Sequence, residues 1–168
     1  PEKIALGKKL FFDTRLSLGG TVSCNSCHHL MSGGDDDGAV TQMANRRLNR
    51  SAPSVWNVAY MSTLYWDGRA KSLESQTADH LVDPNIMQMG TPQAIEARLK
   101  SIPGYVTEFK QTFGENALTI DNISKAIASF ERTLKTPNSP FDQFIKGDEN
   151  ALNASAKRGY HEFIEVGC

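Results

Sequence analysis

The feature that most constrains this chain is the pentapeptide Cys24-Asn25-Ser26-Cys27-His28. Two thiols separated by two residues can add to the two vinyl groups on one edge of a porphyrin. A histidine directly after the second thiol is then held beneath the iron. We therefore predict a c-type haem bound covalently through Cys24 and Cys27, with His28 as an axial ligand of the iron.

Two other interpretations of the cysteine pair are weaker. A redox dithiol of this spacing is expected in a βαβ context, which the sequence does not offer. A zinc site could draw on Cys24, Cys27, His161 and Cys168, but His161 and Cys168 have unusual spacing for zinc ligands. The odd total of three cysteines also argues against a closed disulfide framework.

Length and composition bound the class of protein. The 168 residues are 39% apolar, which is enough for one compact domain with its own core. The formal net charge is -1, so we expect no nucleic-acid partner and no acidic tail. There is no run of about 18 apolar residues, so no membrane span is expected.

The spacing of apolar residues predicts a mainly α chain with long irregular loops. The clearest amphipathic helix is marked by Ile120, Ile123, Ile127, Phe130 and Leu134. Leu152, Ala156, Tyr160 and Phe163 mark the last helix, and Pro137 and Pro140 end the one before it. Further helices are expected over residues 2–12, 72–81, 91–102 and 105–113. Residues 13–22 and 32–38 are expected to form loops, and residues 39–55 to be irregular.

Several polar residues have ordinary structural explanations. His29 is expected to point away from the haem, because it neighbours the ligand on a turn or helix. His80 and His161 lie in expected helices and are better explained by surface or packing roles than as ligands. The Asp35–Gly38 segment lacks the spacing of a calcium-binding EF-hand and is interpreted as a solvated loop.

Six further stretches stand in a specific order around the haem motif: Leu6–Asp13 before it, then Ala52–Asn57, Tyr65–Ala70, Ser72–Glu74, Phe130–Leu134 and Thr136–Asp142. In this order and spacing the chain resembles the bacterial di-haem cytochrome c peroxidase family, which also includes MauG-like enzymes. The resemblance covers essentially the whole chain. It implies a cytochrome c-like haem domain with extra helices and long irregular loops.

The resemblance also implies a domain arrangement. The family has two c-type haem domains, and residues 1–167 would form the first, which carries the peroxidatic haem. The segment Lys157–Gly167 is similar to the stretch that leads into the second haem motif. Cys168 would then be the first cysteine of a second domain, and a second haem is expected in the full-length protein.

The implied reaction is the reduction of hydrogen peroxide to water, with two electrons from a small cytochrome c or a cupredoxin. The implied compartment is the periplasm, with an export signal upstream of Pro1, and the resemblance is also compatible with a homodimer. Two alternatives stay open: a MauG-like haem oxidase that acts on a protein partner, and an electron-transfer cytochrome without peroxidase activity.

Three residues take roles from the resemblance. His28 would be the proximal ligand of the peroxidatic haem. Trp66 would lie near the route between the two haems, as an electron relay or as a packing residue. Arg69 would pair with a haem propionate or form a surface salt bridge.

Three departures from the family pattern concern the open face of the haem and a calcium site. Many members have a histidine in the loop after the haem motif, but residues 35–50 contain none, and Met43 is the nearest candidate ligand. The iron is therefore expected to be five-coordinate or water-ligated. The family glutamate before Met-Gly is replaced by Gln88, which cannot accept a proton as a carboxylate does, and Asp83 is the alternative. Family members often have an asparagine of an interdomain calcium site where this chain has Ser51, so the resemblance leaves calcium as a possible but doubtful cofactor.

Overall fold

The computed structural model describes residues 1–43 and 46–167 and divides the chain into two compact units, Pro1–Lys135 and Thr136–Cys168. The sequence predicts a single domain over residues 1–167, but the core of buried apolar residues ends at Leu134. The segment after Lys135 therefore forms a unit of its own. Cys168, the expected start of a second haem domain, lies outside the described residues.

The prediction of a mainly α chain is confirmed. The first unit contains α1 (Glu2–Phe11), α2 (Leu73–Val82), α3 (Pro92–Lys100), α4 (Pro103–Phe113) and α5 (Ile120–Glu131), and the second contains α6 (Pro140–Ile145) and α7 (Ala154–Glu165). Short 3-10 turns cover Thr14–Leu16, Cys24–Ser26 and Val58–Tyr60. Among the described residues, no helix is long and apolar enough to cross a membrane.

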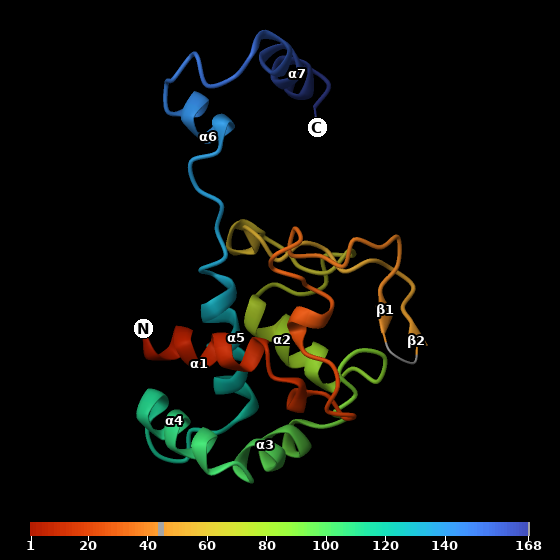
Figure 1. Ribbon diagram of the computed structural model, residues 1–168, viewed down its shortest axis with the longest axis vertical. Helices are drawn as coiled ribbons and strands as arrows, with labels where there is room; N and C mark the ends of the chain where they lie inside the picture. The colour runs from red at the N-terminus through yellow and green to blue at the C-terminus, as the bar shows by residue number, and fades with distance from the viewer. Residues whose placement is uncertain (44–45, 168) are drawn as a thin grey trace. The chain divides into compact units, whose positions relative to one another are not determined.

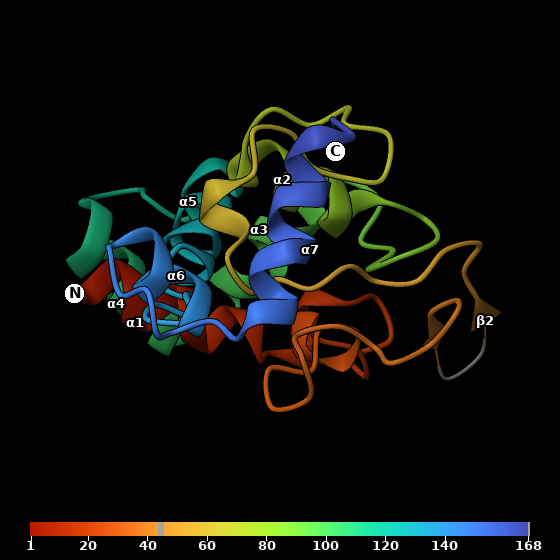
Figure 2. The same cartoon turned by 90° about the horizontal axis from the view of Figure 1, so that it is seen from above.

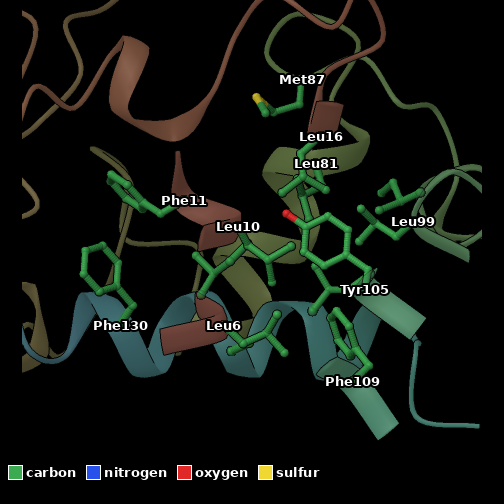
Figure 3. Packing of buried hydrophobic residues seen from close by; sticks show 14 of the residues in the cluster. Leu6, Leu10, Phe11, Leu16, Leu81, Met87, Leu99, Tyr105, Phe109 and Phe130 are labelled. Carbon is green, nitrogen blue, oxygen red and sulfur yellow. The ribbon is translucent and has the colours of Figure 1, made fainter. Parts of the chain in front are cut away.

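The core is built on the crossing of α1 and α5, which Figures 1 and 3 show. Leu6, Leu10 and Phe11 of α1 are buried against α5, and the rings of Phe11 and Phe130 meet edge to face with centroids 5.3 Å apart. A Cβ atom at Gly7 would lie 1.9 Å from the carbonyl oxygen of Ala126, so only glycine permits this approach of the two backbones.

Helices α3 and α4 also contribute buried residues to the core. Ile95, Leu99, Tyr105 and Phe109 are completely buried. The hydroxyl group of Tyr105 donates a hydrogen bond to Asp13, which satisfies the polar end of an otherwise buried ring.

The helix boundaries follow local chemistry. Ser72 and Thr91 cap α2 and α3, since their side chains accept hydrogen bonds from Ser75 N and Ala94 N. Helix α5 ends at Glu131, three residues before the predicted end. The hydroxyl group of Thr133 instead donates to the carbonyl oxygen of Phe130 at 2.7 Å. Leu134 stays buried although it lies beyond the helix.

The region after the haem motif is largely irregular, as predicted, except for one short strand pair. Strands β1 (Gln42–Met43) and β2 (Arg46–Arg47) are antiparallel, with Met43 opposite Arg46. They project from the helical part of the first unit in both views (Figures 1 and 2).

The second unit is held together by a small aromatic contact, and none of its described residues is buried. The ring of Tyr160 on α7 meets Phe141 and Phe144 of α6 with centroid distances of 5.3 and 6.0 Å. Helix α6 differs from the sequence prediction, in which Pro140 only ends the preceding helix. Pro140 instead occupies the first turn of α6, and Ser139 caps it.

Candidate haem-binding site

A cavity of about 410 Å³ lies in the first unit and is bounded by several separate segments. The haem motif forms one wall, residues 48–55 and 64–67 form others, and α2 contributes the residues on its inner face. Leu81, Met87 and Ile127 connect the cavity to the apolar core. The volume falls in the range of pockets that enclose a small organic ligand.

The haem motif forms a tight turn that directs three side chains to this cavity. The amide groups of Cys27 and His28 both donate to the carbonyl oxygen of Cys24, at 3.2 and 3.0 Å. Ser23 and Ser26 cap the turn reciprocally. Cys24, Cys27 and His28 all line the cavity, and neither cysteine forms a disulfide. Burial raises the pKa of both thiols above the ordinary value.

The imidazole of His28 is held in one tautomer by the backbone. Its Nδ1 donates to the carbonyl oxygen of Pro53 at 3.0 Å, since a carbonyl can only accept. The lone pair is then on Nε2, as in histidines that bind metals. Burial lowers the pKa of His28, which favours the neutral form that coordinates iron. His29 instead donates from Nε2 to the carbonyl oxygen of Ser26.

Two free thiols, a neutral imidazole with a fixed tautomer and an apolar cavity fit a c-type haem. The end of α5 adds one feature that the sequence did not suggest. Glu131 lines the cavity at only 7% exposure, and its Oε2 has no hydrogen-bond partner. Burial raises the pKa of this carboxyl to about 8.

The structure also brings three polar residues to the cavity that the sequence analysis did not select for its chemistry. Gln76 and His80 lie four residues apart on the inner face of α2, and Tyr65 precedes that helix. The Tyr65 hydroxyl lies 2.9 Å from His80 Nδ1. The signal was the spacing of Gln76 and His80, which places both on one helix face. His80, expected to be a surface or packing residue, is part of the cavity wall.

Comparison with known proteins identifies the family. The family model described as di-haem cytochrome c peroxidase matches residues 1–150. The chain belongs to the di-haem cytochrome c peroxidase family. It is 44% identical over 166 residues to the cytochrome c551 peroxidase of Nitrosomonas europaea, covering 97% of this chain and 49% of that protein. It is 43% identical over 172 residues to the methylamine utilization protein MauG of Methylorubrum extorquens, covering 100% of this chain and 48% of that protein.

Solved structures in the comparison agree with the fold. A crystal structure of a MauG-like protein associated with microbial copper homeostasis matches with a TM-score of 0.83 and 28% identity, covering 97% of this chain and 49% of that one. The chain therefore spans about half the length of the relatives that it matches.

Three residues that the di-haem peroxidase resemblance selected do line the cavity. Trp66 is 61% exposed and donates from its indole nitrogen to the carbonyl oxygen of Ser51 at 3.0 Å. Arg69 pairs with Asp67 at 3.0 Å. Met43 lies on β1. Their roles toward a haem stay predictions.

The structure does not bring Gln88 to the cavity wall. Its side-chain amide donates to the carbonyl oxygen of Pro84 at 2.8 Å, and Gln88 is not among the residues that line the cavity. Asp83, the alternative, does line the cavity, and its Oδ1 accepts from the amide of Asn85 at 2.7 Å. A catalytic role for Gln88 stays a prediction.

Proposed function

We propose that the full-length protein is a periplasmic peroxidase that reduces hydrogen peroxide to water, with electrons from a small cytochrome c or cupredoxin. The observation that carries the proposal is the convergence of Cys24, Cys27 and His28 on one cavity, with His28 Nδ1 bonded to the Pro53 carbonyl oxygen. Relatives named cytochrome c551 peroxidase support the same reaction class.

Cys24 and Cys27 would hold the haem covalently, and Nε2 of His28 would bind its iron. When bound, a haem supplies the redox chemistry that splits peroxide, while the protein sets access and polarity on the open face. With the haem bound, His28 would hold the iron from one side, and peroxide would approach from the other. The apolar wall formed by Leu81, Met87 and Ile127 limits the water that can enter.

Three further parts of the proposal come from the family. A second c-type haem in the rest of the protein would pass electrons to this one. Trp66 would lie on that route, and its exposed indole is free to contact another domain. The periplasmic location follows from the export that c-type haem attachment requires in bacteria. Calcium is not part of the proposal, since Ser51 stands where the family has asparagine.

A second candidate is a MauG-like oxidase that acts on a side chain of a protein partner. It is kept because the MauG relative is 43% identical to this chain, against 44% for the peroxidase relative. Overall similarity therefore does not separate the two functions.

The test is steady-state peroxide consumption by the full-length protein with a reduced small cytochrome as donor. Rapid turnover, with two donor molecules oxidised per peroxide, supports the peroxidase. Slow turnover together with covalent change of a partner protein would support the oxidase instead. A protein that does not react with peroxide at all would contradict both functions.

A further inference from the structure

The cavity contains a second imidazole, contributed by a different element from the haem motif. His80 lies on the inner face of α2 and lines the same cavity as His28. Its hydrogen bonds are made at Nδ1, to the hydroxyl of Tyr65 at 2.9 Å and to the side-chain amide of Gln76 at 3.0 Å. Among the described residues, no protein atom forms a hydrogen bond with its Nε2.

Tyr65 holds this imidazole in place. The two rings stack with centroids 5.2 Å apart and planes 28° from parallel. The backbone of Tyr65 has a φ of 66°, which is a strained conformation for a bulky residue. The guanidinium of Arg69 lies 3.4 Å from the centre of the Tyr65 ring. The fold thus maintains an unfavourable backbone conformation that sets the position of the His80 ring.

The hydrogen bonds made by the Tyr65 hydroxyl favour one tautomer of His80. The Tyr65 hydroxyl donates to the carbonyl oxygen of Gln76 at 3.2 Å, so its oxygen is left to accept from Nδ1–H of His80. The side-chain nitrogen of Gln76 lies 3.0 Å from Nδ1 in the structure, and a half-turn of this amide exchanges that nitrogen for the oxygen, which then serves as a second acceptor for Nδ1–H. In this arrangement Nε2 carries a lone pair and is a base.

The carboxyl groups that line the cavity are less suited than His80 to accept a proton. Asp67 is paired with Arg69, and one oxygen of Asp83 accepts from the Asn85 amide. Burial raises the pKa of Glu131 to about 8, so its carboxyl is already mostly protonated at pH 7 and is poorly suited to take up another proton. Amide side chains cannot take up a proton. His80 is therefore the group best arranged to accept one.

We propose that His80 is the base that takes a proton from hydrogen peroxide in this cavity, and that Tyr65 is its positioning residue. The inference rests on the proposed function and deepens it. Nε2 accepts one proton of H₂O₂ and returns it to the oxygen that leaves as water. The complete reaction also takes two protons from solvent and two electrons from the donor, giving two waters. The family's missing carboxylate would thus be replaced by an imidazole from α2 and not by Gln88.

Cyanide binding tests this role without an electron donor, because hydrogen cyanide must also lose its proton when it binds ferric haem. The association rate is measured at pH 7 from the Soret band of the full-length, haem-loaded protein. We expect His80→Leu and His80→Gln to slow association about 10²–10⁴-fold, the usual contribution of a general base. Tyr65→Phe should slow it about tenfold, as loss of an orienting partner does.

A control variant on the same helix distinguishes a specific role of His80 from a general disturbance of α2. Asp79→Asn, at an exposed neighbouring position on α2, should leave the association rate unchanged. Haem content and the electron paramagnetic resonance spectrum should be the same in all variants. An unchanged rate in both His80 variants would overturn the inference. So would a change from low-spin to high-spin iron in His80→Leu, because His80 would then be an axial ligand. Failure of peroxide turnover would instead contradict the proposed function, in a separate measurement.

Discussion

At the scale of single residues, Glu131 gives the clearest pH-dependent prediction. Burial raises its pKa from 4.5 to about 8, so the folded state favours the protonated carboxyl. The stability that this provides is complete below pH 4.5, falls as the pH rises to about 8, and is then lost. Glu131→Gln should therefore match the wild type near pH 4.5 and be more stable by a few kcal/mol at pH 9.

Urea denaturation of the haem-loaded protein at the two pH values checks this prediction. Glu115→Gln, at an exposed carboxylate that pairs with Lys110, is the matched control and should show no comparable difference between the two pH values. If Glu131→Gln and the wild type were equally stable at pH 9, the carboxyl would not be held in its neutral form.

Site residues that are adjacent in the chain could be predicted from the sequence, and those that meet only through folding could not. Cys24, Cys27 and His28 are adjacent in the chain, so their shared chemistry is visible in the sequence. Tyr65 and His80 are 15 residues apart and meet only because the loop and α2 fold together. Gln88 was selected from its neighbours in the chain, but the turn there directs its amide to Pro84.

At the scale of helices, the contact between α1 and α5 is the most sensitive point of the fold. In Gly7→Ala, the added methyl group would overlap the Ala126 carbonyl oxygen, and backbone atoms cannot move aside cheaply. We expect the free energy of unfolding to fall by about 1–3 kcal/mol. The measurement is the urea midpoint of the haem-loaded protein.

Gly104→Ala provides the control for this substitution. Nothing lies within 4 Å of a Cβ at Gly104, which is in the first turn of α4. Alanine should be neutral there or stabilise by up to about 1 kcal/mol, because it has the higher helix propensity. If Gly7→Ala behaved like this control, the close backbone approach would not limit the packing.

Most helices could be predicted because their signals are local. The caps Ser72 and Thr91 and the stop at Gly114 lie within one turn of the ends that they set. The errors occur where two local signals compete. Pro140 both ends one segment and starts α6, and the Thr133 hydroxyl bond at the end of α5 is not visible as a break in the apolar pattern.

At the scale of the whole molecule, the structure divides the chain into two compact units, and the prediction of a single haem domain over residues 1–167 stays a prediction. The amphipathic pattern of α7 predicts a helix with an apolar face, but it does not say what covers that face. Phe163, Ile164 and Val166 are exposed in the structure, and the chain spans about half the length of its relatives. A pattern in one segment cannot reveal a partner surface that lies in another part of the protein.

The central claim is that this unit holds a haem covalently through Cys24 and Cys27. It is tested most directly by extracting the purified full-length protein with acidified organic solvent and measuring the intact mass of the chain. The wild type should keep a haem whose bonds map to peptides containing Cys24 and Cys27. In the Cys24→Ser, Cys27→Ser double variant, this site should release its haem or bind none. A wild-type chain whose Cys24–His28 peptide carries no added haem mass after extraction would contradict the account.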